Sequence, residues 1–153
     1  MTKAELLHLR RAETPKTVRL LELYPDDERD RKPSERSRTA LELALTFLNE
    51  ERLITDLCTG NAATPHLTGP HPQTIADAVA ALRESFEAND KVIAAADFDR
   101  IVDFFGTRLP LGTVLLIVLL DHIHHRGQFT IYSRLAGARV PRIYGPSADE
   151  PNA

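Results

Sequence analysis

The stretch between Pro110 and Gly137 constrains the fold of this chain more than any other. Proline favours the start of a helix and glycine the position just past its end, so this pair predicts one long helix reaching about Ala136. Residues Val114 to Leu120 are apolar on every side, which predicts that the helix is buried all round. The surface that buries it would lie within a helical bundle or at a contact between two subunits.

Three further blocks carry the apolar periodicity of amphipathic helices. The second block shows it most clearly, because Leu41, Ala44, Leu45 and Leu48 follow the i, i+3, i+4, i+7 template. The blocks cover residues 3–24, 34–57 and 72–96.

The boundaries of these blocks rest on proline and hydroxyl residues. Pro15 interrupts the first block, which predicts a kink or a restart with Thr14 as the N-cap. Ser34 and Ser37 are both candidate N-caps of the second helix, and Pro72 is a candidate first residue of the third.

The segments between the blocks predict exposed or irregular structure. Residues 25–33 form a charged connector, and residues 59–72 form a loop rich in Thr, Gly and Pro. Residues 98–106 predict a short extended segment or an apolar strap across one end, and the tail over 140–151 has too many prolines for a helix. The sequence therefore predicts an all-α, four-helix bundle with a long last helix and an irregular C-terminal tail, as a single domain over 1–153.

Composition limits the partners and the cellular compartment that we expect for this protein. The net charge is −3 and there is no block rich in Lys or Arg, so a sequence-independent nucleic-acid partner is disfavoured. The single cysteine, Cys58, excludes an internal disulfide and favours a reducing compartment. The first residues lack an apolar signal core, and no apolar run approaches the ~20 residues of a membrane span. We expect a cytoplasmic protein without a membrane partner.

The candidate chemistry is concentrated from Asp121 to Gln128, where three of the six histidines lie within four residues. Packing explains such a cluster poorly, because a buried imidazole costs free energy unless its nitrogens find partners. Neutral imidazole is also the commonest side-chain metal ligand. On a helix, Asp121 and His125 lie one turn apart on one face and form the natural chelating pair. His122 with His125, at i and i+3, is the second choice.

A tight site needs at least one more ligand from a facing helix. The second block offers Thr46, Glu50 and Glu51, of which Glu50 is the best donor. Three protein ligands leave coordination positions open, which is the pattern of catalytic rather than structural sites. Mixed nitrogen and oxygen donors suit Zn, Ni, Fe or Mn.

Simpler interpretations of the same residues stay open. In one interpretation Asp121 pairs with an arginine or caps a loop. His124 then lies at an interface or supports the ligands without binding the metal. His122 is then exposed or paired, Cys58 packs, and Gly127 permits close approach of a neighbouring helix. The isolated histidines predict surface positions: His8, His66 and His71.

The segment from Leu119 to Leu135 carries a family resemblance. With His124-His125-Arg126-Gly127-Gln128 and then Tyr132, it resembles the last helix of the DinB/YfiT-like superfamily. The tail resembles that of one DinB subgroup, through Gly137, Val140-Pro141 and Ile143 to Glu150, and Glu42-Leu43-Ala44 is weakly similar to the start of the family's second helix. The resemblance implies an up-down-down-up four-helix bundle that is often a homodimer.

The resemblance also implies a divalent metal held by three histidines, one on the second helix and two on the last. His125 falls on the final histidine, and Asp121 falls on the preceding one as a carboxylate. The position on the second helix falls on Thr46, whose neutral hydroxyl is a poor ligand, and Glu50 one turn further on is the candidate substitute.

Relatives of this kind include metal-dependent thiol transferases and a thiol-dependent isomerase, while the DinB name refers to induction by DNA damage. The resemblance therefore implies a metal-dependent transferase or hydrolase that acts with a low-molecular-weight thiol or another small molecule. Asp121, His125 and Glu50 would hold the metal, and His124 and Gln128 would orient the site. The alternative is a non-catalytic dimer in which the same cluster is a structural polar network without metal.

Overall fold

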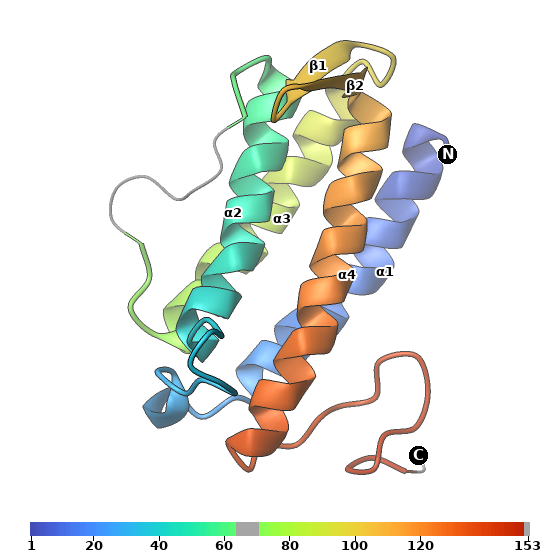
Figure 1. Ribbon diagram of the computed structural model, residues 1–153. Coiled ribbons are helices and arrows are strands. Elements are labelled where there is room, and N and C mark those ends of the chain that lie inside the picture. The colour runs from blue at the N-terminus through green and yellow to red at the C-terminus, as the bar shows by residue number, and fades with distance from the viewer. Residues whose placement is uncertain (64–70, 152–153) are drawn as a thin grey trace.

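The computed structural model describes residues 1–63 and 71–151, and these form the predicted four-helix bundle (Figure 1). A short 3-10 helix, η1 (Asp26–Glu28), follows the first helix, and a hairpin of β1 (Ile101–Phe104) and β2 (Thr107–Pro110) precedes the last. Among the described residues, no helix is both long enough and apolar enough to cross a lipid bilayer. The four helices are α1 (Lys3–Glu22), α2 (Ala40–Thr59), α3 (Ile75–Ala95) and α4 (Leu111–Leu135).

Helices α2 and α3 run in the same direction, opposite to α1 and α4, which is the expected up-down-down-up course (Figure 1). Helix α1 packs against α3 and α4, and α2 packs against the same two helices. Helices α2 and α4 are therefore antiparallel neighbours, so side chains of the two predicted ligand segments can meet between them.

Helix α2 starts later than predicted, because its N-cap is Thr39 rather than Ser34 or Ser37. The Thr39 hydroxyl accepts the backbone N–H of Glu42, and the Glu42 carboxylate accepts the backbone N–H of Thr39. This reciprocal pair satisfies two donors at once, which a lone serine cannot do. The hydroxyls of Ser34 and Ser37 instead bond to each other, 2.9 Å apart, in the preceding loop.

The predicted restart of the first helix at Thr14 and the predicted first residue of the third helix, Pro72, are wrong. Helix α1 passes through Pro15 without interruption, and Thr14 is inside it, with its hydroxyl donating to the carbonyl of Arg10 at 2.8 Å. Proline removes only one backbone hydrogen bond there, and packing against two helices holds α1 together. Helix α3 begins after the N-cap Thr74, so Pro72 lies outside the helix.

The segment over 98–106 contains an extended part, the first of the two predicted alternatives. Strands β1 and β2 pair in antiparallel register, with Phe104 opposite Thr107. The connecting turn consists of Phe105 and Gly106, whose φ angles are 51° and 84°. Two positive φ angles are typical of the tight turns that join hairpins, but a bulky side chain is disfavoured in that conformation.

Helix α4 ends as predicted, but the bundle of a single chain does not bury it all round, so of the two predicted burying surfaces only a contact between subunits could complete it. Gly137, with φ 71°, follows the last turn. Leu120 is 56% exposed and Ile117 is 38% exposed, so one face of the apolar run is uncovered in the single chain. Gly127 is also exposed and no other group approaches the position of a Cβ there, so the expected close helix contact is absent within the described residues.

A layer of buried polar side chains crosses the bundle about midway and separates two apolar clusters. One cluster surrounds Phe47 and Phe129 toward the η1 end, and the other surrounds Leu6 and Leu111 toward the hairpin end. Burying polar groups between them is costly unless each finds partners. The layer comprises Arg10, Glu13, Thr17, Glu50, Glu51, Asn89, His122 and Arg126.

Part of this layer attaches the C-terminal tail to the bundle. The guanidinium of Arg126 is almost fully buried and donates to Glu13 Oε2 at 2.5 Å and to the Tyr144 hydroxyl at 2.6 Å. The Tyr144 hydroxyl also donates to Glu13 Oε2 at 2.7 Å, and Lys16 donates to the other oxygen of Glu13 at 2.7 Å. These contacts join α1, α4 and the tail in one charged network.

This network predicts a loss of stability in acid. Burial raises the pKa of Glu13, but hydrogen bonds from Lys16, Tyr144 and Arg126 outweigh it and lower the pKa to about 2. The stabilisation is complete above the ordinary pKa of 4.5 and is lost as the pH falls toward 2. Between pH 6 and pH 3 the free energy of unfolding in urea should fall by about 2 kcal/mol through this group. The free energy of unfolding of the Glu13→Gln variant should fall by correspondingly less over that range. If wild type and variant lost the same free energy between pH 6 and pH 3, the assignment to Glu13 would be contradicted.

Candidate metal centre

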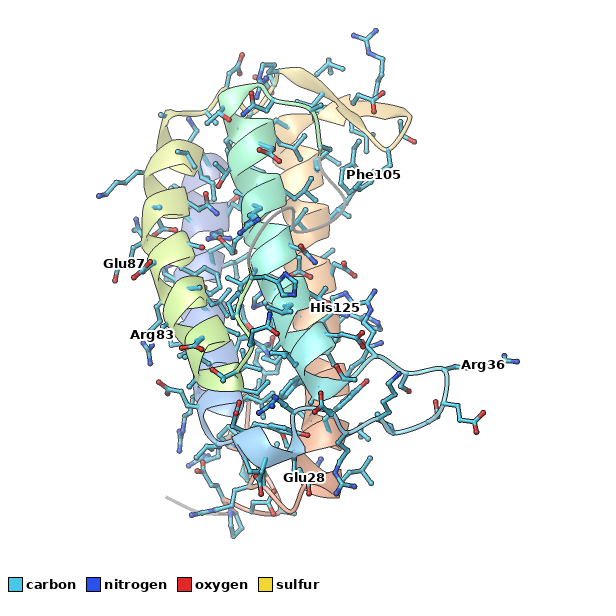
Figure 2. All side chains as sticks on the ribbon, turned by 90° about the vertical axis from the view of Figure 1, so that its left-hand side faces the viewer. Glu28, Arg36, Arg83, Glu87, Phe105 and His125 are labelled. Carbon is cyan, nitrogen blue, oxygen red and sulfur yellow. The ribbon has the colours of Figure 1, made fainter. Side chains whose placement is uncertain are left out.

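Three potential ligand atoms meet between α2 and α4. His125 Nε2 lies 3.4 Å from Asp121 Oδ2 and 3.9 Å from Glu50 Oε1, and all three atoms lie within 4.8 Å of one another. Asp121 and His125 are i and i+4 on α4, and Glu50 comes from the antiparallel α2. Figure 2 shows His125 midway along the bundle, between Phe105 at the hairpin end and Arg36 at the loop end. The structure thus brings together the three residues predicted from the sequence.

Gln128 sets the orientation of His125. The Nδ1–H of His125 donates to Gln128 Oε1 at 3.0 Å, and the Gln128 amide donates to His124 Nε2 at 3.0 Å. With its proton on Nδ1, neutral His125 presents the lone pair of Nε2 toward Glu50 and Asp121. Such support fixes the tautomer and ring orientation of metal-ligating histidines.

His122 orients Glu50 in the same way and lies deeper in the bundle. Its Nδ1 bonds Glu50 Oε2 at 2.9 Å, and the Thr17 hydroxyl donates to its Nε2 at 2.8 Å. Burial, with Arg126 and Arg10 nearby, lowers the pKa of His122 to about 3, so the ring is neutral. Its second-choice role as a ligand is wrong, because both ring nitrogens already have partners.

The other oxygen of Glu50 has no such partner. Glu50 Oε1 is buried and accepts no hydrogen bond from the described residues. Burial raises the pKa of Glu50 well above its usual range, and the nearby charges of Asp121 and Glu51 raise it further. An unpartnered buried carboxylate oxygen is costly, so its retention requires an explanation outside packing.

A divalent cation fits this set of donors. Ligand bonds of about 2.1 Å in tetrahedral geometry place neighbouring donor atoms about 3.4 Å apart. The imidazole and Asp121 are already at 3.4 Å, Glu50 Oε1 is about half an ångström further from the imidazole, and the two carboxylate oxygens lie within 4.8 Å of each other. The Asp121 side chain is 56% exposed whereas that of Glu50 is 7% exposed, so the group opens to one side only.

The other two candidates on α2 do not join the group. The Thr46 hydroxyl accepts from Arg38 at 2.9 Å and donates to the Glu42 carbonyl at 3.0 Å. Glu51 points to the other side of α2, where Arg10 holds both of its oxygens at 2.9 and 3.0 Å. Glu50 is therefore the acidic side chain of α2 that faces α4 at this level.

The open side of the group faces a pocket of about 960 Å³. Its wall includes the uncovered α4 residues Ile117 and Leu120 together with His124. A group of donors at the base of such a pocket has the arrangement of a site that binds a small molecule.

Among the described residues, His8, His71 and Cys58 do not belong to the group of ligand atoms. His8 is exposed as predicted, His71 is exposed at the rim of the pocket, and His66 lies outside the described residues. Burial raises the pKa of Cys58 to about 11, in spite of Arg100 nearby, so its thiol is a poor nucleophile at neutral pH.

Comparisons with known proteins agree with this fold. Over 49 residues the chain is 43% identical to the uncharacterized protein YrdA of Bacillus subtilis (strain 168), a match that covers 32% of this chain and 29% of YrdA. The crystal structure of a DinB-like protein of Bacillus subtilis, YjoA, superposes with a TM-score of 0.75 at 22% identity, covering 92% of this chain and 96% of that one. The crystal structure of a DinB-like protein of Bacillus cereus ATCC 10987 superposes with a TM-score of 0.79 at 23% identity, covering 91% of this chain and 95% of that one.

The family model of the DinB superfamily matches residues 7–129, which contain all of α2 and α3 and most of α1 and α4. The chain therefore belongs to the DinB superfamily.

Proposed function

We propose that the protein binds a divalent cation through Glu50, Asp121 and His125 and acts on a small molecule held in the adjoining pocket. One observation carries this proposal. Three acceptor atoms meet with no donor among the described residues, and one of them is the buried, unpartnered Oε1 of Glu50. Neighbouring lone pairs repel unless a cation lies between them, so a bound cation accounts for the arrangement.

The proposed activity is a metal-dependent transferase or hydrolase reaction. A bound divalent cation lowers the pKa of a thiol or a water and supplies a nucleophile at neutral pH. The chain contributes orientation, since Gln128 holds His125 and His122 holds Glu50. Because Cys58 is remote and has a raised pKa, a thiol nucleophile would be a separate low-molecular-weight molecule. We place this activity in the cytoplasm, where a single cysteine stays reduced.

Metal titration tests the proposal. After chelation, the wild-type protein should take up one equivalent of Zn, Mn, Ni or Fe(II) per chain in a calorimetric titration. The Asp121→Ala/His125→Ala variant should take up none. His8→Ala, which removes an exposed histidine elsewhere, should behave as wild type. Stoichiometric metal in the double variant would refute the ligand assignment.

The hydrogen bonds of Gln128 predict a smaller loss of metal affinity than removal of a ligand. Replacing it with Met removes both hydrogen bonds that orient His125 and His124 while keeping the helix. Loss of such outer support typically costs 10- to 100-fold in metal affinity, and we expect a loss of about that size. Thr130→Ala, five residues beyond His125 and nine beyond Asp121 on α4, is the control. An unchanged affinity in Gln128→Met would show that the ring orientation does not depend on this amide.

A second candidate is a homodimer without catalysis, in which the polar cluster is structural. The observation that favours a dimer is a row of exposed apolar side chains on one face of α4: Ile117, Leu120, Ile131 and Leu135. His124 lies on the same exposed face. A metal-free protein whose dimer dissociates in the His124→Ala variant would favour this candidate. A dimer that also binds one metal per chain would favour the first.

A further inference from the structure

The pocket beside the metal centre has two chemically different ends. Along α2, Thr46 lies one helical turn before Glu50, and Leu53 lies about one turn after it. The wall around Thr46 is polar and includes Arg38 and Glu42, whose carboxylate accepts the backbone N–H of Thr39, whereas the wall around Leu53 is apolar. One turn of helix is about 5.4 Å, so each end lies within about 6 Å of the candidate ligands along the helix.

Arg38 is the only lysine or arginine among the described residues that line this pocket. Its guanidinium makes one hydrogen bond, to the neutral hydroxyl of Thr46 at 2.9 Å, and no salt bridge among the described residues. Arginine has five N–H donors in a planar fork, so most of its donors remain free, while its charge also acts on Glu42 and Glu50 of the same pocket.

Arg38 is also held in place. Its backbone carbonyl accepts the Tyr132 hydroxyl of α4 at 2.8 Å, and its side chain is attached to α2 through Thr46. A guanidinium that is held at two points and makes no salt bridge within 4 Å among the described residues is suited to bind an oxyanion through a bidentate contact.

The opposite end is built from aromatic and aliphatic side chains. Phe104 and Phe105 of the hairpin, with ring centroids 4.8 Å apart, line it together with Leu53, Ile117 and Leu120. Phe105 is 56% exposed and has a φ of 51°, a conformation in which asparagine or glycine is preferred. A strained and exposed aromatic ring at a pocket is more readily explained by ligand contact than by stability.

From this arrangement we infer the substrate class of the proposed function: a small molecule with an oxyanion, carboxylate or phosphate, at one end and an apolar group at the other. Arg38 binds the oxyanion, the Phe104–Phe105 wall covers the apolar group, and the reacting atom lies between them at the candidate ligands. The side-chain oxygen of Asn49, which is buried without a partner among the described residues and lies in the same wall, accepts an O–H or N–H of the ligand. The position of the reacting atom rests on the proposed function, whereas the binding of the oxyanion and of the apolar group does not.

Three probes of one length test the two ends: 4-phenylbutanoate, 4-phenylbutyl phosphate and the neutral 4-phenylbutan-1-ol. Calorimetric affinities are measured for metal-free and Zn-treated protein. In the wild type at least one anionic probe should bind about 10-fold or more tightly than the alcohol, as expected of charged hydrogen bonds. The tighter of the two anions identifies the oxyanion.

Variants separate the contributions. Arg38→Met should reduce the ratio of anion to alcohol affinity to about 1, while Arg36→Met, which removes an exposed arginine of the same loop, should leave it unchanged (Figure 2). Phe105→Asn should weaken all three probes by a similar factor, keep the ratio and raise the thermal midpoint of unfolding. The inference is overturned if the ratio survives in Arg38→Met, if it falls equally in Arg36→Met, or if the wild type shows no anion preference.

A metal titration of the same samples keeps the two proposals distinct. An Arg38-dependent ratio in a protein that binds no metal would support the oxyanion contact and refute the metal. Metal binding with a ratio that survives in Arg38→Met would place the anion on the metal and overturn the role of Arg38.

Discussion

Replacing Glu50 with Gln is expected to stabilise the metal-free protein and to weaken metal binding at least 100-fold. The glutamine keeps the size of the side chain and an oxygen that can accept from His122, so the hydrogen bond of 2.9 Å is retained. It removes a carboxylate that is buried, has an unpartnered oxygen and lies near Asp121 and Glu51. Relief of that cost should raise the free energy of unfolding at pH 7.5 by about 1–3 kcal/mol.

The control for this prediction is Asp121→Asn. Asp121 is 56% exposed, so its removal should weaken metal binding with little change in stability of the metal-free protein. Urea unfolding after chelation measures the stability of the metal-free protein, and calorimetry measures the affinity for metal. If Glu50→Gln destabilised the metal-free protein, Glu50 would be a structural group and the case for a functional carboxylate would fail.

Replacing Arg126 with Met should have the largest effect on stability, a loss of about 3–5 kcal/mol. Arg126 is 1% exposed and holds Glu13 and Tyr144, so its removal leaves the Glu13 carboxylate without its buried cationic partner. Breaking one side of a buried ion pair is far costlier than losing an exposed one.

Two variants make this second prediction specific. Arg19→Met removes an exposed ion pair to Glu150 of the same tail and should cost no more than about 1 kcal/mol. The double variant Glu13→Leu/Arg126→Met replaces the pair with apolar groups and should recover part of the loss. Urea unfolding measures all three. A loss below 1 kcal/mol for Arg126→Met would mean that the network contributes little.

Helix content was predictable because apolar periodicity and end signals agree in this chain. Gly137 ended α4 as predicted, whereas the start of α2 was misplaced because several hydroxyl residues precede it. The signal that separates them is present in the sequence: only Thr39 has a Glu, Glu42, three residues later. The exposed face of α4 was not predictable from periodicity, since apolar residues that line a pocket resemble those of a core.

The ligand group was predictable because it depends on local spacing along α4 and on one antiparallel neighbour. His122 was expected to be exposed or paired, and it is paired, but its burial and its contact with Glu50 were not predicted. It occupies the core stripe of α4, seven residues from both Leu115 and Phe129, and Arg10 and Thr17 continue the stripe of Leu6 on α1. Polar residues at core positions of facing helices therefore indicated the layer of buried polar side chains in the sequence.

The most direct test of the metal centre is a crystal structure of the protein grown with Mn or Zn, with diffraction recorded on both sides of the absorption edge of the metal. We predict one anomalous peak per chain, within bonding distance of Glu50 Oε1, Asp121 Oδ2 and His125 Nε2. A crystal with the metal at millimolar concentration and no peak among these three atoms would contradict the proposed centre.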